Sequence, residues 1–226
     1  MAERPIFVPV EPTSGWVDAV PVQLTWHPGF SIKQKQASIN ALHSSFRELY
    51  GKDRRVLEIS RRSPDPIGQK LSAFALTVQL PGTNKRISVE SAFQGSKKFS
   101  GGGPYQDLYL KSAREAKTDQ RLRSSGHLEA FIWVDQWWPL QPTTAFYDWL
   151  YIQALLAEPS LAAAIMEYDA FSDIEFNPAK SLNCQARTAA FYKSLVSNGV
   201  DPATLRHQSS FLELYKEETP GQLTLF

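Results

Sequence analysis

The pattern of apolar and polar positions predicts two prominent helices. The first follows Ser31, which can form a capping box with Gln34, and it ends at Gly51. Its apolar positions recur at helical spacing: Ile39, Leu42, Phe46, Leu49 and Tyr50. The second helix covers residues 145–157, with Thr144 as its cap, and it is apolar on nearly all sides. Such a helix is expected to be central and buried.

Shorter periodic segments complete the predicted secondary structure. Strands are expected at residues 56–60, 73–80, 86–89 and 131–134. Residues 135–139 are expected to form an aromatic loop. Further helices are expected at residues 107–123, 160–168 and 184–198, the last capped by Asn183, and a short one is expected to start at Asp201. These elements predict an α+β fold in a single domain, mostly helical with a small β-sheet.

The ends of the chain differ in character from its middle. Residues 1–30 are rich in proline and contain Trp16 and Trp26. Disordered tails are seldom this aromatic, so we interpret residues 1–54 as an N-terminal extension whose extended segments pack on the core. Residues 55–215 then form the main domain, and residues 216–226 form a C-terminal tail.

Candidate chemistry is most concentrated in residues 88–99. Read as a helix, this stretch places Glu90, Gln94 and Lys97 within about 60° of one another on one face. A carboxylate, an amide and an ammonium group in one row can grip and polarise a sugar-phosphate ligand. The same row also fits an ordinary solvated face with a weak Glu–Lys attraction.

Two other groups of basic side chains either bind a phosphate or nucleic acid or are simply solvated. Lys33 and Lys35 lie in the first two turns of the helix over residues 32–50, where they either hold a phosphate or are simply solvated. A further basic arc either follows a nucleic-acid backbone or is a solvated helix face: Lys111, Arg114, Lys117 and Arg121.

Aromatic and acidic residues in the second half add candidates. Trp137 or Trp138 either stacks on a base or fills the core. Asp148 lies inside the apolar helix, where a carboxylate needs a partner or a chemical role. Asp173 and Glu175 place two more carboxylates in a turn.

Composition restricts the class of protein. The chain has 226 residues and a net charge of +1, which argues against massive non-specific binding of nucleic acid. Cys184 is the single cysteine and the four histidines are scattered, so a cysteine-based zinc site is excluded and a histidine-based one is disfavoured. Neither a signal peptide nor an apolar run of membrane-spanning length is present, so we expect a cytoplasmic protein without membrane contact.

Two motifs in order carry a resemblance to a known family. Leu71-Ser72-Ala73-Phe74 is followed by Gly82 and then by Glu90-Ser91-Ala92-Phe93-Gln94-Gly95-Ser96-Lys97. This order resembles the NADAR superfamily, which includes the YbiA-like proteins and shows a Leu-Ser-Asn-Phe element and a Glu-His-x-Phe-Gln-Ala-x-Lys helix. Ala73 replaces the Asn, and Ser91 replaces the His.

The second half resembles the family more loosely. Asp173 with Asn183 is similar to the family's Asp…Gly-x-Asn-x-Leu-Gly region, but the neighbouring Trp-Gly and the flanking glycines are missing. The resemblance covers roughly residues 55–198, which makes residues 55–215 a NADAR-like catalytic domain. The departures, the N-terminal extension and the Phe146-Tyr147-Asp148-Trp149 helix resemble the branch that is paired with toxins that ADP-ribosylate guanine in DNA.

The resemblance implies an N-glycosidase. In the toxin-linked branch its substrate is ADP-ribosylated guanine in DNA, expected to be single-stranded, and the products are guanine and ADP-ribose. The protein then acts as the antitoxin of a DNA ADP-ribosyltransferase toxin. An N-glycosidase of phosphorylated riboflavin-pathway intermediates and a non-catalytic module that binds ADP-ribose or the toxin are the alternatives. The reaction requires no metal or organic cofactor.

The resemblance and the required chemistry also indicate site residues. The expected catalytic residues are Glu90, Lys97, Asp148 and Asp173. The expected ligand-binding residues are Lys35, Ser72, Phe74, Phe93, Gln94, Trp149 and Asn183. Lys97 either binds pyrophosphate or, if burial lowers its pKa, attacks the anomeric carbon and passes through a Schiff base. Trp149 or Phe93 is expected to stack on a ring, and Asn183 to bind ribose hydroxyls.

The tail carries a separate motif. After Pro220-Gly221, residues Gln222–Phe226 resemble the Gln-Leu-x-Leu-Phe peptides by which bacterial proteins dock on the replicative sliding clamp. The alternative is a C-terminal segment that packs on its own domain.

Overall fold

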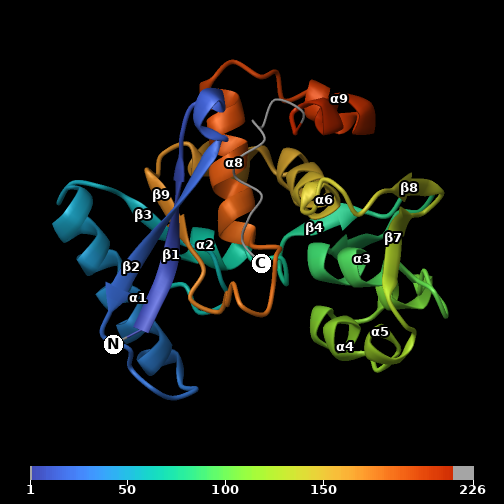
Figure 1. Ribbon diagram of the computed structural model, residues 1–226, viewed down its shortest axis with the longest axis horizontal. Helices are drawn as coiled ribbons and strands as arrows, with labels where there is room; N and C mark the ends of the chain where they lie inside the picture. Colours follow the sequence, from blue (N-terminus) through green and yellow to red (C-terminus); the bar gives the residue numbers. More distant parts are fainter. Residues whose placement is uncertain (1, 216–226) are drawn as a thin grey trace.

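The computed structural model describes residues 2–215, and Figure 1 shows their arrangement. A four-stranded sheet with α1 and α8 occupies one side of the view, α3, α4 and α5 occupy the other, and α6 lies between them. The predicted α+β class is confirmed. The predicted clamp-binding peptide, Gln222–Phe226, lies outside the described residues.

The main sheet has the strand order β2-β1-β9-β3. β1 (Ala2–Pro9) pairs in antiparallel fashion with β2 (Val17–Leu24) on one side and with β9 (Ala170–Ser172) on the other. β3 (Val56–Glu58) runs parallel to β9, with Glu58 opposite Ser172. The N-terminal strands thus share a sheet with β3 and β9, while the division of the chain after residue 54 stays a prediction.

Each face of this sheet packs on a different helix. Alternating residues of the strands point to opposite faces, because successive side chains of a strand do so. One face contacts α1 (Ile32–Tyr50), and the other meets the main core with α8 (Gln185–Ser197). The first face carries Ile6, Val56 and Ala170, and the second carries Phe7, Leu57 and Phe171. The predicted capping box of α1, between Ser31 and Gln34, is present.

α6 (Ala145–Leu156) is buried at the centre, as its all-round apolar pattern predicted. Thr144 is its N-cap residue, but the Thr144 hydroxyl donates to Asp148 Oδ2 (2.6 Å) and makes no cap hydrogen bond. Other short elements pack around α6 or connect the larger ones: η1 (Pro12–Ser14), α2 (Pro66–Lys70), α7 (Pro159–Ile165), η3 (Thr204–Arg206) and α9 (Gln208–Glu213). No helix within residues 2–215 has the length and apolar character needed to cross a bilayer.

The rest of the chain forms two small sheets and several short helices. The strands are β4 (Thr77–Gln79) paired with β5 (Arg86–Ser88), and β6 (Lys97–Phe99), β7 (Leu128–Trp133) and β8 (Gln136–Trp138) in that order. The helices are α3 (Val89–Gly95), η2 (Gln106–Leu110), α4 (Ala113–Thr118) and α5 (Arg121–Ser124).

The prediction of one helix over residues 107–123 is wrong. The chain breaks after η2, because Ser112 starts α4 with its own capping box to Glu115. It breaks again at Asp119, whose carboxylate accepts from the Arg121 backbone N–H (3.0 Å). The basic residues therefore do not form one continuous arc.

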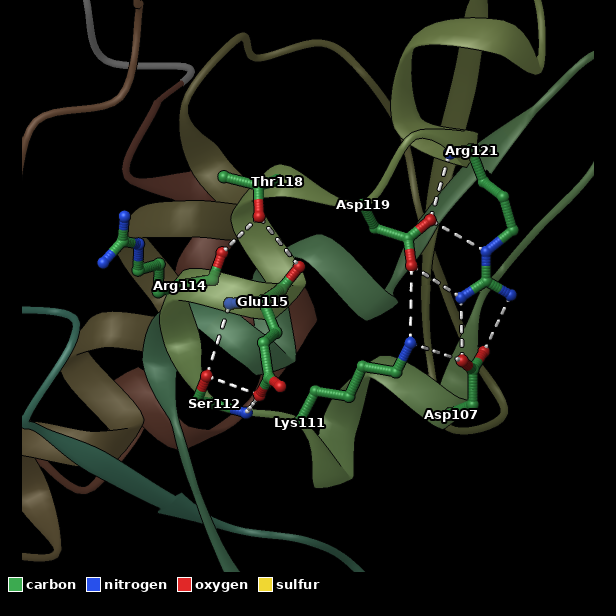
Figure 2. A network of polar contacts seen from close by, with 8 residues as sticks. All are labelled: Asp107, Lys111, Ser112, Arg114, Glu115, Thr118, Asp119 and Arg121. Carbon is green, nitrogen blue, oxygen red and sulfur yellow. Dashed lines mark hydrogen bonds and ion pairs between the residues drawn. The ribbon is translucent and has the colours of Figure 1, made fainter.

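Ion pairs occupy part of that basic surface (Figure 2). Arg121 binds Asp107 Oδ2 (2.7 Å) and Asp119 Oδ1 (2.9 Å), and Lys111 lies 3.5 Å from Asp119 Oδ2. Figure 2 shows the Arg114 guanidinium pointing away from this network. The structure therefore favours a solvated face over a nucleic-acid track for Lys111 and Arg121.

Two further predictions are wrong. Residues 136–138 form strand β8 and not a loop, because they pair with β7. Trp138 is fully buried there, whereas Trp137 is 59% exposed. The N-cap residue of α8 is Cys184 and not Asn183.

The short helix expected to start at Asp201 is the single 3-10 turn η3, which begins at Thr204.

Candidate active site

Glu90 lies near the start of α3, in a position fixed by its backbone. Its N–H donates to the carbonyl of Ala73 (2.9 Å), and the helix begins at Ser88, whose Oγ accepts from the Ser91 N–H. The Glu90 side chain is 7% exposed. Gln94 Nε2 donates to Glu90 Oε1 (2.8 Å), so these two residues share a helix face as their spacing predicted. Glu90 is therefore a buried carboxylate held in one orientation.

Lys97 is not on that helix. α3 ends at Gly95, and Lys97 is the first residue of β6, where it pairs with Phe131. Gly95 packs so closely on Tyr109 that a Cβ atom would lie 2.5 Å from the tyrosine ring. The pairing with β7 thus replaces the last helical turn expected from the sequence, and the prediction of a single helical row is wrong.

The Lys97 ammonium group nevertheless remains in the electrostatic field of Glu90. Burial lowers the pKa of Lys97 to about 8, the charge of Glu90 opposes this shift, and the charge of Lys117 adds to it. Lys97 Nζ lies 4.8 Å from the centre of the Phe93 ring. It makes no ion pair or hydrogen bond with the other residues in the range 2–215. An amine with a lowered pKa and no bound anion is available to a ligand.

The Lys97 charge should lower the stability of the fold at neutral pH. Below about pH 8 the folded state must bury a charged ammonium group. Between about pH 8 and the usual pKa of 10.5, only the unfolded state keeps the proton, so this contribution to stability rises with pH. We expect Lys97→Met to raise the thermal unfolding midpoint at pH 7, and to raise it less at pH 10. Exposed Lys52→Met is the control, and a lower midpoint for Lys97→Met at pH 7 would contradict this account.

Aromatic rings and a second cation line the same region. Lys117 Nζ lies 3.6 Å from Glu90 Oε1 and 5.1 Å from the centre of the Phe74 ring. The Phe93 ring packs edge-on against Tyr147, at 5.1 Å. Phe93 is 6% exposed, so its expected role in stacking on a ligand would use only a small part of the ring.

A second acidic cluster lies where β3 and β9 end. Because these strands are parallel, their carboxyl ends meet at one edge, which brings Glu58 beside residues 172–174. Glu58 Oε1 accepts from the Ile174 N–H (2.9 Å), and Glu58 Oε2 accepts from Ser172 Oγ (2.5 Å). Asp173 is 9% exposed, and burial followed by the charge of Glu58 raises its pKa to about 8.

Gln185 connects this acidic cluster to the segment that contacts Glu90. Its Nε2 donates to Asp173 Oδ2 (3.0 Å) and to the Ile59 carbonyl (2.7 Å). Its Oε1 accepts from the N–H of Ala73 (2.7 Å), the residue whose carbonyl binds the Glu90 N–H. Ser72, next to Ala73, is 1% exposed, and its Oγ accepts from the Phe74 N–H (3.4 Å).

Tyr147 is close enough to both acidic groups for their charges to act on its hydroxyl. Burial raises the pKa of its hydroxyl well above the usual value, and the charges of Glu90 and Asp173 both contribute. The hydroxyl makes no hydrogen bond to the rest of residues 2–215. Sequence reasoning missed Glu58, Gln185 and Tyr147, since only the parallel pairing of a three-residue strand and the packing of α6 and α8 bring them to the site.

Lys35 approaches from α1. Its ammonium group pairs with Glu175 Oε1 (3.2 Å) and lies 5.2 Å from the centre of the Trp26 ring. The backbone N–H of Glu175 donates to Asp173 Oδ1 (3.0 Å), so Lys35 belongs to the rim of the Asp173 turn. It already has a carboxylate partner, with which a phosphate would compete.

Two of the expected site residues, Asp148 and Trp149, have structural surroundings. Asp148 accepts from Arg187 and from the hydroxyls of Thr144, Thr188 and Tyr215, and it is 1% exposed. Trp149 packs on Trp138 with ring centres 4.9 Å apart, and its Nε1 donates to the Arg206 carbonyl (3.4 Å). Asn183 Oδ1 is buried without a partner among the described residues. The Asp148 and Trp149 contacts belong to the core between helices.

Two hollows and the possible metal ligands were compared with the expected site residues. One hollow of about 300 Å³ is lined by Leu80, Lys85 and Tyr109, and one of about 360 Å³ by Glu11, Arg54 and Lys193, so both lie apart from the expected site residues. Within residues 2–215, no group of three His, Cys, Asp or Glu side chains could hold a metal ion.

Comparison with known proteins decides the family. The family model described as "DarT1-associated NADAR antitoxin" matches residues 2–222. The chain belongs to this family. The NADAR resemblance, including the toxin-associated branch, is thus confirmed, and membership of an antitoxin family implies a cognate toxin. The match includes β1, β2 and α1 of this NADAR protein as well as the elements around Glu90. A comparison with curated proteins gave no match.

Proposed function

We propose that this NADAR protein is an N-glycosidase that removes ADP-ribose from ADP-ribosylated guanine in DNA and so reverses the modification made by its toxin. The observation that carries the proposal is an amine with a lowered pKa, Lys97, within the electrostatic field of the buried Glu90 carboxylate, in a member of a DarT1-associated antitoxin family. Lys97 has a pKa of about 8, and Glu90 is buried and oriented by Gln94.

The side chains suit the cleavage of a bond between ribose C1″ and a base nitrogen. As this bond breaks, positive charge builds on the sugar, and the Glu90 carboxylate stabilises it. The bonding electron pair goes to the base, which needs a proton. Asp173, with a pKa of about 8, is largely protonated at neutral pH and supplies that proton.

Lys97 has two roles compatible with its surroundings. As a neutral amine it attacks C1″ while the bond to the base breaks, then loses a proton, and the C1″–O4″ bond of the ribose ring opens to give a Schiff base that water hydrolyses. As an ammonium ion it binds the pyrophosphate of ADP-ribose. The lowered pKa and the lack of a bound carboxylate favour the first role.

A phosphorylated small molecule, such as a riboflavin-pathway intermediate, is the second candidate substrate. The observation in its favour is that Lys111 and Arg121 are held in ion pairs with Asp107 and Asp119. These cations are therefore less available to a nucleic-acid backbone than the sequence predicted.

The decisive assay uses a single-stranded oligonucleotide that carries one ADP-ribosylated guanine. We expect the wild type to release ADP-ribose and Glu90→Gln to do so about 10²–10³-fold more slowly, because the amide cannot stabilise the sugar cation. Exposed Glu48→Gln is the matched control and should keep the wild-type rate.

Three other results of this assay would contradict part of the proposal. Full activity of Glu90→Gln would remove Glu90 from the catalytic residues. If the wild type releases nothing but binds ADP-ribose tightly, the protein is a binding module. Turnover of a phosphorylated riboflavin-pathway intermediate, without turnover of the oligonucleotide, would support the second substrate.

A further inference from the structure

Glu58 holds the backbone on both sides of Asp173. Its carboxylate accepts from Ser172 Oγ (2.5 Å) and from the Ile174 N–H (2.9 Å), which are the neighbours of Asp173 in the chain. Glu58 is 1% exposed and lies at the end of β3. A buried carboxylate in this position fixes the turn that presents Asp173.

The hydrogen-bonded chain continues to α1. His43 Nε2 lies 2.8 Å from Ser172 Oγ, and burial lowers the pKa of His43 to about 3. The imidazole is therefore neutral and takes part as a hydrogen-bond partner, not as a cation. When the Ser172 hydroxyl donates to Glu58, His43 Nε2–H donates to Ser172. Burial raises the pKa of Glu58, while its hydrogen bonds from Ser172 and from the Ile174 N–H lower it, so these bonds favour the charged form of Glu58.

Each oxygen of the Asp173 carboxyl group accepts one hydrogen bond and can still bind a proton. Oδ1 accepts from the Glu175 N–H and Oδ2 accepts from Gln185 Nε2, both at 3.0 Å, which leaves a lone pair on each oxygen. Burial is the first cause of its raised pKa and the charge of Glu58 the second. The other titratable groups that face this pair are His43, Tyr147, Tyr151, Glu175 and Cys184.

We propose that Glu58, held by Ser172 and His43, is a positioning residue that fixes the carboxyl group of Asp173 and keeps it protonated for transfer to the departing base. This inference rests on the proposed N-glycosidase function. As the C1″–N bond breaks, the base takes its electron pair and the Asp173 proton. Water then adds to C1″ and releases Lys97 from its Schiff base, and a proton from that water returns to Asp173 through solvent, so the site ends in its starting state.

The test is the pH dependence of ADP-ribose release in wild type and Glu58→Gln. Glutamine keeps the shape and still accepts from Ile174, while its amide donates to Ser172, which can then donate to His43. With the neighbouring charge removed, Asp173 should lose its proton at lower pH. The alkaline limb of the rate profile should therefore move down by about one pH unit or more, and the acid limb should stay in place.

Two results would overturn the proposal. One is an unchanged profile, and the other is a loss of rate that is equal at every pH, which would mean that Glu58 is only structural. Glu48→Gln is the control for a carboxylate lost elsewhere, and thermal unfolding checks that Glu58→Gln is folded.

A second measurement separates this inference from the proposed function. Carboxyl ¹³C NMR titration of Asp173 needs no substrate, so it works even if the oligonucleotide is not cleaved. We expect the Asp173 pKa to fall in Glu58→Gln by the same amount as the alkaline limb. An Asp173 pKa that is equal in both proteins would overturn the role of Glu58, whatever the substrate is.

Discussion

Lys97→Ala is expected to abolish release of ADP-ribose from the modified oligonucleotide, with kcat lower by about 10³-fold or more. The change removes the amine whose pKa of about 8 leaves a substantial neutral fraction at pH 7.5. In the wild type the rate should rise with pH up to about 8, as Lys97 loses its proton, and fall at higher pH, as Asp173 loses its proton. Single-turnover kinetics from pH 6 to 10 measure both effects.

Lys97→Arg separates the two roles of this residue. Arginine keeps the positive charge and binds phosphate, but it cannot act as a nucleophile at neutral pH. A phosphate-binding Lys97 predicts that Lys97→Arg keeps kcat within about tenfold, whereas a nucleophilic Lys97 predicts a loss as large as that of Lys97→Ala.

Chemical trapping gives an independent readout. If the Lys97 nitrogen bonds to C1″, borohydride reduces the Schiff base and leaves ADP-ribose attached to the protein. Mass spectrometry should locate the adduct at Lys97, and neighbouring half-buried Lys98 is an internal control. A wild type that turns over but gives no adduct, together with an active Lys97→Arg, would contradict the nucleophilic role.

Capping and apolar spacing predicted the structure correctly where a segment's own sequence determines its conformation. The capping box at Ser31 and the apolar spacing after it predicted α1 correctly, and the all-round apolar pattern predicted the burial of α6. The i, i+4 pair Glu90 and Gln94 was also predictable, since one helical turn brings the two side chains together.

The rest of the site depends on pairing between distant segments. Helical periodicity placed Lys97 on α3, but pairing with Phe131 ended the helix two residues earlier. Glu58 gave no signal, because its importance arises from a parallel partner, β9, that is only three residues long. Gln185 joins two clusters more than 80 residues apart in sequence, Asp173 and the segment at Ala73, and no local pattern contains such a contact.

Asp148 was predicted as catalytic because a carboxylate in an apolar helix needs a partner or a chemical role, and the structure supplies partners. Its oxygens accept from Thr144 (2.6 Å), Arg187 (3.0 Å), Tyr215 (2.7 Å) and also Thr188. These contacts join α6 to α8 and to the segment after α9. Such a fully bonded carboxylate has little freedom to act on a ligand.

Asp148→Ala is therefore expected to lower the free energy of unfolding by about 3–5 kcal/mol, because it removes the buried acceptor that three hydroxyl groups and Arg187 share. Urea denaturation measures this loss. Exposed Asp18→Asn is the control and should change stability by less than about 0.5 kcal/mol.

Asp148→Asn distinguishes a structural role from a catalytic one. The amide oxygen can still accept two hydrogen bonds, so the variant should be destabilised less than Asp148→Ala. At a temperature where Asp148→Asn is folded, we expect kcat within about threefold of the wild type, because the groups beside Lys97 are unchanged. A fall in kcat of about 10²-fold in the folded Asp148→Asn protein would instead mean that Asp148 acts on the substrate, and that its hydrogen bonds hold a reactive group and not only the core.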